Sequence, residues 1–152
     1  MKNELSIEDK LLLIKDLSAR LPYAVTVEHT SGFRGTLHDI TVHHMYDDND
    51  NIYDAICYTD FFGDNDDIYI EYFKPYLFPM SSMTEEQYES FIIVSGWDGD
   101  YEDIKRGKFS CVGYIGIDYI YDTIDWCNKN HYDYRGLIPK GLALDATGLN
   151  IY

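Results

Sequence analysis

Residues 23–73 contain four segments rich in Val, Ile, Thr, Tyr and Phe, the residue types that favour β-strands. Short stretches of Gly, Ser, Asp and Asn separate the segments, and those residue types are typical of turns. Because short turns reverse the direction of the chain, the pattern predicts an antiparallel β-meander. Its strands are expected at residues 23–30, 33–46, 51–62 and 68–73.

The turn at residues 47–50 predicts the register of the two central strands. If these four residues form the turn, Tyr46 pairs with Asn51, and apolar residues farther along come to lie opposite one another. These apolar pairs are Ile40 with Cys57 and Val42 with Ala55. They would form the core face of the sheet, and the opposite face would be solvated.

The solvated face is expected to be acidic. The same register places on it the pairs Asp39 with Tyr58 and His43 with Asp54, and then Asp60 and Glu71. A strand of about ten residues spans roughly 33 Å, so this negative charge would extend along the sheet.

A helix is predicted at the start of the chain. Ser6, followed by two acids, has the pattern of an N-cap, and Pro22 ends the helix at about Arg20. Its apolar stripe is expected to be Leu11, Ile14, Leu17 and Leu21.

Two further helices are predicted after the strands. A capping box at 84–87 begins one that reaches about Val94, and the other covers 118–130. Between the predicted elements, 74–83 is expected to be an irregular connection, 97–108 a polar loop and 109–117 a strand. The whole pattern predicts a single acidic α+β domain over residues 1–152, an antiparallel meander of about four to five strands with about three helices packed on one face.

The charge is segregated along the sequence. Residues 35–104, here called the acidic stretch, hold 17 acids and one base, Lys74, whereas the rest of the chain holds 10 acids and 11 bases. The net charge of −15 is therefore carried by the middle of the chain. Blocks of like charge repel one another and lower stability, so the asymmetry favours a functional explanation. The preference of acids for turns and helix starts is the alternative explanation of each single block.

Composition excludes several classes of protein. A pI near 4.4 argues against direct binding to nucleic acid or to an anionic membrane. No run approaches the roughly 18 apolar residues of a membrane span, and the N-terminus lacks the apolar stretch of a signal peptide. The three cysteines, Cys57, Cys111 and Cys127, are widely spaced and odd in number, which indicates a reducing cytoplasm and no disulfide framework.

No catalytic or metal-binding motif is evident in the sequence. The segment that begins at Asp47 resembles an EF-hand loop, but Ile52 and Tyr58 stand where a glycine and a bidentate glutamate are required. Cys127 and His131 are spaced to share a metal ion, yet further ligands are not evident, and a buried cysteine beside a helix-end histidine that favours the helix dipole is the preferred interpretation. We therefore predict no catalytic residue, no metal site and no cofactor.

Three segments, residues 9–25 (DKLLLIKDLSARLPYAV), 74–86 (KPYLFPMSSMTEE) and 126–146 (WCNKNHYDYRGLIPKGLALDA), carry a family resemblance. They resemble an uncharacterised family of short proteins encoded by Bacteroides-type gut bacteria and by their phages and mobile elements. The resemblance covers about a third of the chain and leaves residues 35–70 outside it. It implies a bacterial cytoplasm and an accessory gene of phage or mobile DNA, and it supplies no catalytic residue.

The sequence therefore favours a non-enzymatic binding protein whose acidic sheet face and turns engage a basic surface on a host protein, as a DNA-mimic inhibitor of a nuclease or defence complex would. Tyrosine, at 15 residues, is abundant and suits a protein interface. The predicted contact residues are Asp47, Asp48, Asp50, Asp54, Asp60, Asp64, Asp66 and Asp67, with Tyr53 and Tyr58. The alternatives are a small metal-dependent or hydrolytic enzyme that uses clustered carboxylates with His43 or His131, and a structural accessory protein.

Overall fold

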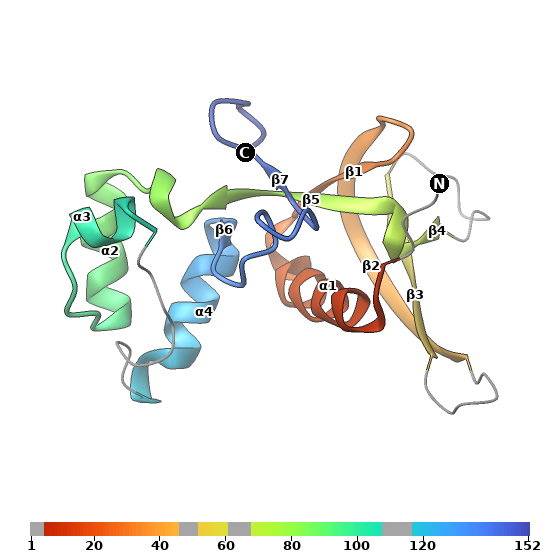
Figure 1. Cartoon of the computed structure of the whole chain (residues 1–152), viewed down its shortest axis with the longest axis horizontal. Coiled ribbons are helices and arrows are strands. Elements are labelled where there is room, and N and C mark those ends of the chain that lie inside the picture. Colours follow the sequence, from red (N-terminus) through yellow and green to blue (C-terminus); the bar gives the residue numbers. More distant parts are fainter. Residues whose placement is uncertain (1–4, 46–51, 61–67, 108–116) are drawn as a thin grey trace.

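The structure is a computed structural model that describes residues 5–45, 52–60, 68–107 and 117–152. Within these residues, seven strands form a mixed sheet with helices beside it (Figure 1). The strand order is β4-β3-β2-β1-β5-β6, and β7 also pairs with β5. The strands are β1 (Thr26–His29), β2 (Arg34–Met45), β3 (Ile52–Thr59), β4 (Ile68–Tyr69), β5 (Phe73–Pro79), β6 (Tyr132–Asp133) and β7 (Leu144–Asp145). The predicted α+β class is confirmed.

The antiparallel meander is formed by β1 to β4, as predicted, but it ends earlier than expected. The predicted fourth strand contains only two residues of β4 and then a 3-10 turn, η2 (Ile70–Tyr72). The chain continues as β5, which pairs antiparallel with β1 and parallel with β6 and β7.

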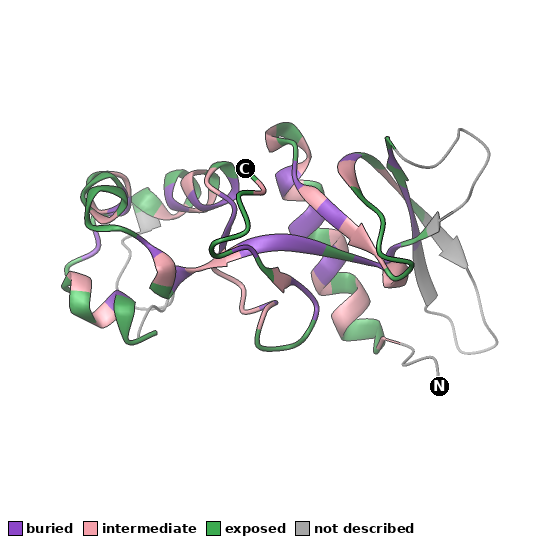
Figure 2. Cartoon of the chain, turned by 90° about the horizontal axis from the view of Figure 1, so that it is seen from above, coloured by how far each residue is buried: buried purple, intermediate pink, exposed green. Residues whose placement is uncertain are grey.

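β5 replaces part of the irregular connection that was predicted from its prolines. Proline lacks an N–H donor, so Pro75 and Pro79 argued against a strand inside a sheet. The ladder around β5 uses other residues instead: the amide of Phe78 donates to the carbonyl of His131 at 2.9 Å, and the carbonyl of Leu77 accepts from Ala146 N at 2.8 Å. The middle of β5 is buried (Figure 2).

The first helix, α1 (Ile7–Arg20), packs against the sheet. Its N-cap is confirmed, since the Ser6 side chain accepts a hydrogen bond from Asp9 N at 3.1 Å. The predicted stripe was partly wrong, because Leu11 is exposed and Leu13 is buried. The buried face of α1 also contains two charged residues, Asp16 and Arg20, which a search for apolar periodicity passes over. The short η1 (Leu21–Tyr23) follows the helix.

Two hydrophobic cores are joined by β5. One lies between α1 and the sheet and includes Leu13, Leu17, Val27, Leu37, Ala55, Cys57, Ile70, Phe73 and Leu77. The other lies among the later helices and includes Met80, Met83, Phe91, Trp97, Ile104, Cys127 and Tyr132. The later helices thus surround the far end of β5, while α1 covers the sheet (Figure 1).

The helices of the second core are α2 (Glu85–Ser95), α3 (Tyr101–Lys105) and α4 (Ile120–Lys129), with the short η3 (Met80–Ser82) and η4 (Ile117–Tyr119) before α2 and α4. The predicted capping box is confirmed: Thr84 N donates to Gln87 Oε1 at 2.8 Å, and Gln87 N donates to Thr84 Oγ1 at 3.2 Å. The expected polar loop at 97–108 was wrong in part, because Asp100 caps α3 and Ile104 anchors it. Residues 109–116 of the predicted last strand lie outside the described residues.

Candidate functional site

The register predicted for the two central strands is confirmed. Ile40 pairs with Cys57, Val42 with Ala55, His43 with Asp54 and Asp39 with Tyr58. Nearer the start of β2 the register shifts between Leu37 and Asp39, a β-bulge. The shift places Leu37 in the core, although strict alternation would point it away from the face of Ile40. A bulge of this kind has no single-residue signature, so the sequence did not reveal it.

The outer face of β2 and β3, opposite α1, carries Asp39 and Tyr58 as exposed residues, and Asp60 follows just after β3. We call these three residues, together with the register position of Asp54, the outer sheet face. Two of its carboxylates also bond to the backbone. Asp60 Oδ1 accepts from Thr36 N at 2.8 Å, and Asp39 Oδ1 accepts from Ile40 N at 2.8 Å. The Asp60 bond thus links the end of β3 to β2, and both acids still face solvent.

The other predicted contact residues are only partly described. Asp47, Asp48, Asp50, Asp64, Asp66 and Asp67 lie outside the described residues. Tyr53 and Asp54 are placed by strand register, opposite His44 and His43. By alternation, Asp54, Tyr58 and Asp60 share one face of β3 and its end, with the buried Ile56 between Asp54 and Tyr58.

The expectation that Glu71 belongs to the outer sheet face was wrong. Glu71 lies in η2, and its carboxylate pairs with the ammonium of Lys10 on α1 at 2.7 Å. The 3-10 turn breaks the two-residue alternation on which the expectation depended, and it directs Glu71 toward the helix side of the sheet.

Most ion pairs among the described residues join bases to acids that lie outside the acidic stretch. Four bases pair with acids outside the stretch: Arg20 and Arg135 with Asp16, Arg34 with Glu28, and Lys140 with Asp9. Within the described part of residues 35–104, Glu71 is the carboxylate that takes part in an ion pair. The other described acids of the stretch take part in none of the ion pairs found among the described residues.

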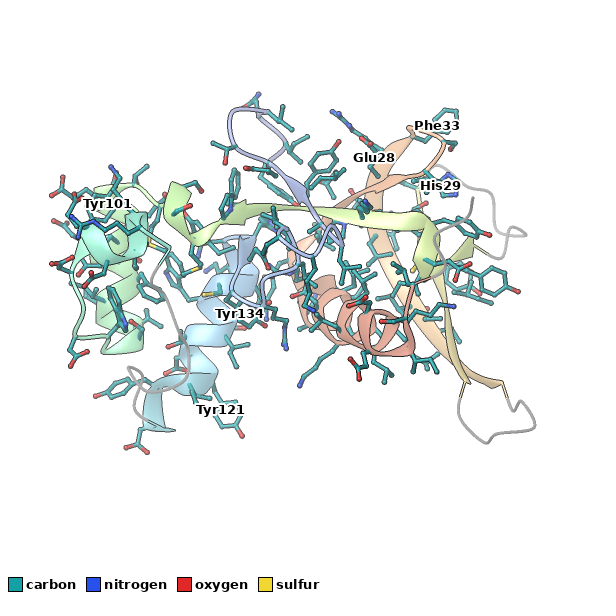
Figure 3. The ribbon with its side chains drawn as sticks, viewed as in Figure 1. Glu28, His29, Phe33, Tyr101, Tyr121 and Tyr134 are labelled. Atoms are coloured by element: carbon teal, nitrogen blue, oxygen red, sulfur yellow. The ribbon has the colours of Figure 1, made fainter. Side chains whose placement is uncertain are left out.

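A buried charged cluster links α1 to the end of the chain. The Arg20 guanidinium donates to Asp16 through Nε at 2.8 Å and through a terminal nitrogen at 3.1 Å, and that nitrogen also donates to the Tyr132 carbonyl at 2.8 Å. Arg135 lies 3.3 Å from Asp16, and Tyr134 lies between α4 and α1 (Figure 3). Segments 9–25 and 126–146 thus meet in this cluster, which has a structural role.

His131 also belongs to this part of the molecule. Its ring stacks on the ring of Tyr152, with centroids 3.6 Å apart, and it is buried. Burial, with a smaller contribution from the Arg20 charge, lowers the pKa of His131 to about 4. The expected favourable interaction of a charged His131 with the helix dipole was therefore wrong, whereas Cys127 is buried as expected. No group of three or more potential metal ligands occurs among the residues that the structure describes.

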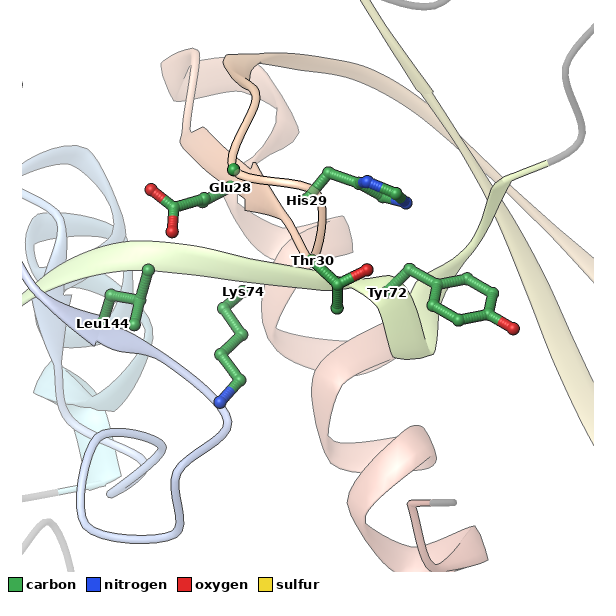
Figure 4. A pocket seen from close by; sticks show the side chains of 7 residues that line it. Glu28, His29, Thr30, Tyr72, Lys74 and Leu144 are labelled. Carbon is green, nitrogen blue, oxygen red and sulfur yellow. The ribbon is translucent and has the colours of Figure 1, made fainter. Parts of the chain in front are cut away.

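A pocket of about 270 Å³ lies beside the β1–β2 hairpin (Figure 4). Its lining includes Glu28, His29, Tyr72 and Lys74. The Glu28 carboxylate already accepts hydrogen bonds from the Tyr76 hydroxyl and from Arg34, which lower its pKa. The side chains of Glu28 and Lys74 point in different directions, so this acid and this base do not meet in the pocket (Figure 4).

Comparisons with family models, with curated proteins and with solved structures find no match for this chain. Among the described residues, none of the helices combines the length and the apolar character needed to cross a bilayer. The functional argument therefore depends on the charge and geometry of the chain itself.

Proposed function

We propose that the protein is a non-enzymatic acidic binding protein that engages a basic surface on another protein through the outer sheet face and the acidic turns predicted at residues 47–50 and 63–67. The observation that carries the proposal is the separation of charge: most described acids of residues 35–104 lie exposed, while four bases, Arg20, Arg34, Arg135 and Lys140, pair with acids outside this range. An uncompensated negative surface costs stability through self-repulsion, and a basic partner would offset that cost.

The contact residues of this proposal are those expected from the sequence. Asp54, Asp60 and Tyr58 belong to β3 and its end, and Asp39 lies opposite Tyr58 on β2. Tyr58 supplies rigid apolar area among carboxylates, a combination favoured in interfaces. β2 is a 12-residue strand, which corresponds to roughly 40 Å of extended chain, so the surface is long enough to follow an extended basic groove.

We further propose that the partner is a host protein whose basic surface normally binds nucleic acid, in the cytoplasm of a bacterium that carries the gene on a phage or mobile element. An extended array of carboxylates can occupy such a groove in place of phosphates. Duplex DNA should then compete with the protein for its partner, which distinguishes a DNA mimic from other acidic binding proteins.

The test is affinity capture from a bacterial lysate at low and high salt, with Asp48→Lys and Asp66→Lys combined in one variant. We expect wild type to retain a basic protein at low salt, to lose it at high salt, and to release it when duplex DNA is added. The matched control reverses two exposed acids remote from the sheet, Asp98→Lys and Glu102→Lys, with the same change in net charge. Equal capture by wild type and by a folded Asp48→Lys/Asp66→Lys variant would contradict the proposal.

The enzymatic alternative gains no support from the described residues. It required carboxylates that converge in a concave site, and the pocket beside the β1–β2 hairpin contains one carboxylate that is already bonded to Arg34 and Tyr76.

A further inference from the structure

The side-chain hydroxyl of Tyr152 is inserted between the backbones of β1 and β5. Just beyond the two strands, Thr30 N donates directly to the Tyr72 carbonyl at 2.9 Å. Bonded pairs recur at every second residue of an antiparallel ladder, so two such steps along the same register make Thr26 and Tyr76 the next candidates for a direct bond. The Tyr152 hydroxyl takes the place of that bond, because it accepts from Thr26 N at 3.1 Å and donates to the Tyr76 carbonyl at 2.7 Å.

This insertion lies where β5 changes its partner. β1 pairs with β5 up to Pro75, and β6 pairs with it from Phe78 onward. The amide of Phe78 donates to the His131 carbonyl at 2.9 Å, two residues after the carbonyl that accepts from Tyr152. The hydroxyl therefore fills the step between the β1 ladder and the β6 ladder.

The ring of Tyr152 has aromatic neighbours of its own. It stacks on the His131 ring, with centroids 3.6 Å apart and planes 6° from parallel, and it lies tilted against the Phe78 ring at 5.9 Å. Burial raises the pKa of Tyr152 to about 12, so the hydroxyl keeps the proton that it donates. We call the Thr26 amide, the Tyr76 carbonyl and the rings of His131 and Phe78 the tyrosine slot.

Tyr152 reaches the tyrosine slot from an exposed loop that follows β7 (Figure 1). The amides of this loop bond locally. Thr147 N donates to Asp145 Oδ1 at 2.8 Å, and Leu149 N donates to the Ala146 carbonyl at 3.1 Å. Tyr152 itself is 42% exposed, so its ring borders on solvent. Exposed segments with local bonds are the parts of a fold that open most readily, and Tyr152 is what joins this one to β1 and β5.

We propose that the tyrosine slot is a binding site for phenols, which the chain fills with its own Tyr152 and vacates when the loop carrying Tyr152 opens. A phenol hydroxyl both accepts and donates, which is what the Thr26 amide and the Tyr76 carbonyl together require. An aromatic molecule without the hydroxyl would leave both backbone groups unpaired, and sites of that kind reject such analogues strongly. The tyrosine slot is separate from the outer sheet face, and the inference does not depend on the proposed function.

The test is a titration of the full-length Tyr152→Ala protein with phenol, followed by amide chemical shifts. We expect shifts centred on Thr26 and His131, with a dissociation constant on the order of 1 mM. Benzene should bind about tenfold more weakly or less, and so should phenol to wild type, whose slot is filled. The matched control is Tyr121→Ala, which removes a tyrosine that is 82% exposed on α4 and should behave as wild type does.

A blocked Gly-Tyr-Gly peptide distinguishes the two sources of a phenol. If the peptide binds Tyr152→Ala more tightly than phenol does, the natural occupant besides Tyr152 is a tyrosine of another protein chain. If phenol binds more tightly, the site is assigned to a small molecule.

The second variant, Tyr152→Phe, keeps the ring and removes the hydroxyl, so it tests the site even if Tyr152→Ala does not fold. Hydrogen exchange of the Thr26 amide should become about tenfold faster or more, whereas the directly bonded Thr30 amide should be unchanged. Three results would overturn the inference: no phenol binding by folded Tyr152→Ala, equal affinities for benzene and phenol, or unchanged exchange at Thr26 in Tyr152→Phe.

Discussion

Asp16 and Arg20 form an ion pair one turn apart on α1, and both side chains are completely buried. Residues near the end of the chain contact this pair: Arg20 donates a hydrogen bond to the Tyr132 carbonyl, and Arg135 lies close to Asp16. Buried charges are expensive to desolvate, so each partner depends on the other to remain ionised inside the protein. The cluster fixes α1 against β6 and thereby joins the two cores.

Arg20→Met is expected to lower the free energy of unfolding by about 3–5 kcal/mol, because it leaves the Asp16 carboxylate buried with only Arg135 as a partner. Urea denaturation followed by circular dichroism measures the change. The control is Arg34→Met, whose pair with Glu28 is exposed and should contribute under about 1 kcal/mol. Similar losses of unfolding free energy in both variants would show that the buried pair contributes no more stability than the exposed pair.

A second prediction concerns pH and His131. The pKa of its imidazole falls from 6.5 in the unfolded chain to about 4 in the folded protein, so the unfolded state binds more protons between these values. The free energy of unfolding therefore keeps the full contribution of the neutral, buried His131 above pH 6.5. It loses this contribution as the pH falls toward 4. We expect wild type to lose roughly 2 kcal/mol over this range through this group.

The measurement is chemical denaturation of wild type and His131→Asn between pH 4 and pH 7. Asparagine tolerates the left-handed backbone at this position, where φ is 59°, so the variant tests titration and not strain. The variant should lose less stability than wild type as the pH falls. The same pH dependence in both proteins would assign it to other groups, such as the hydrogen-bonded Glu28.

The third prediction concerns Gln87, whose side-chain oxygen accepts hydrogen bonds from Thr84 N and from the Tyr132 hydroxyl at 2.7 Å. It thus joins the start of α2 to β6. Gln87→Ala should cost more stability than Thr84→Ala, which removes only a helix cap worth about 1 kcal/mol. Gln87→Glu retains both acceptors and should recover most of the loss in thermal denaturation at neutral pH. If Thr84→Ala proves the more damaging change, the bond to Tyr132 contributes little.

Local patterns predicted much of the fold. The pairing of Ile40 with Cys57 followed from alternation and turn length alone, because a one-residue slip would expose the whole apolar set. The caps at Ser6 and Thr84 followed from short-range hydrogen bonding. Such features depend on neighbours within a few residues, so they can be inferred from the sequence.

Long-range contacts account for what the sequence did not predict. Arg20 is buried because it meets Tyr132, 112 positions later, and no local pattern marks a helix arginine for burial. β5 forms despite its prolines because β1, β6 and β7 supply partners on both sides. Of the candidate contact residues, Tyr58 was predicted to be exposed by alternation, and it is exposed.

The last prediction tests whether the acidic stretch is retained at a cost to stability. Residues 35–104 carry 17 acids against one base, so screening their repulsion should stabilise the fold. We expect the free energy of unfolding of wild type to rise with sodium chloride from about 20 to 200 mM, a range over which the Debye length falls from about 20 Å to about 7 Å. Asp48→Lys/Asp66→Lys should be more stable than wild type at low salt, by about 1 kcal/mol, and should respond less to salt.

A variant that gains stability while losing capture of the basic partner would show that these acids serve binding at the expense of stability. A variant that is less stable at low salt would instead assign the two acids a structural role in their turns.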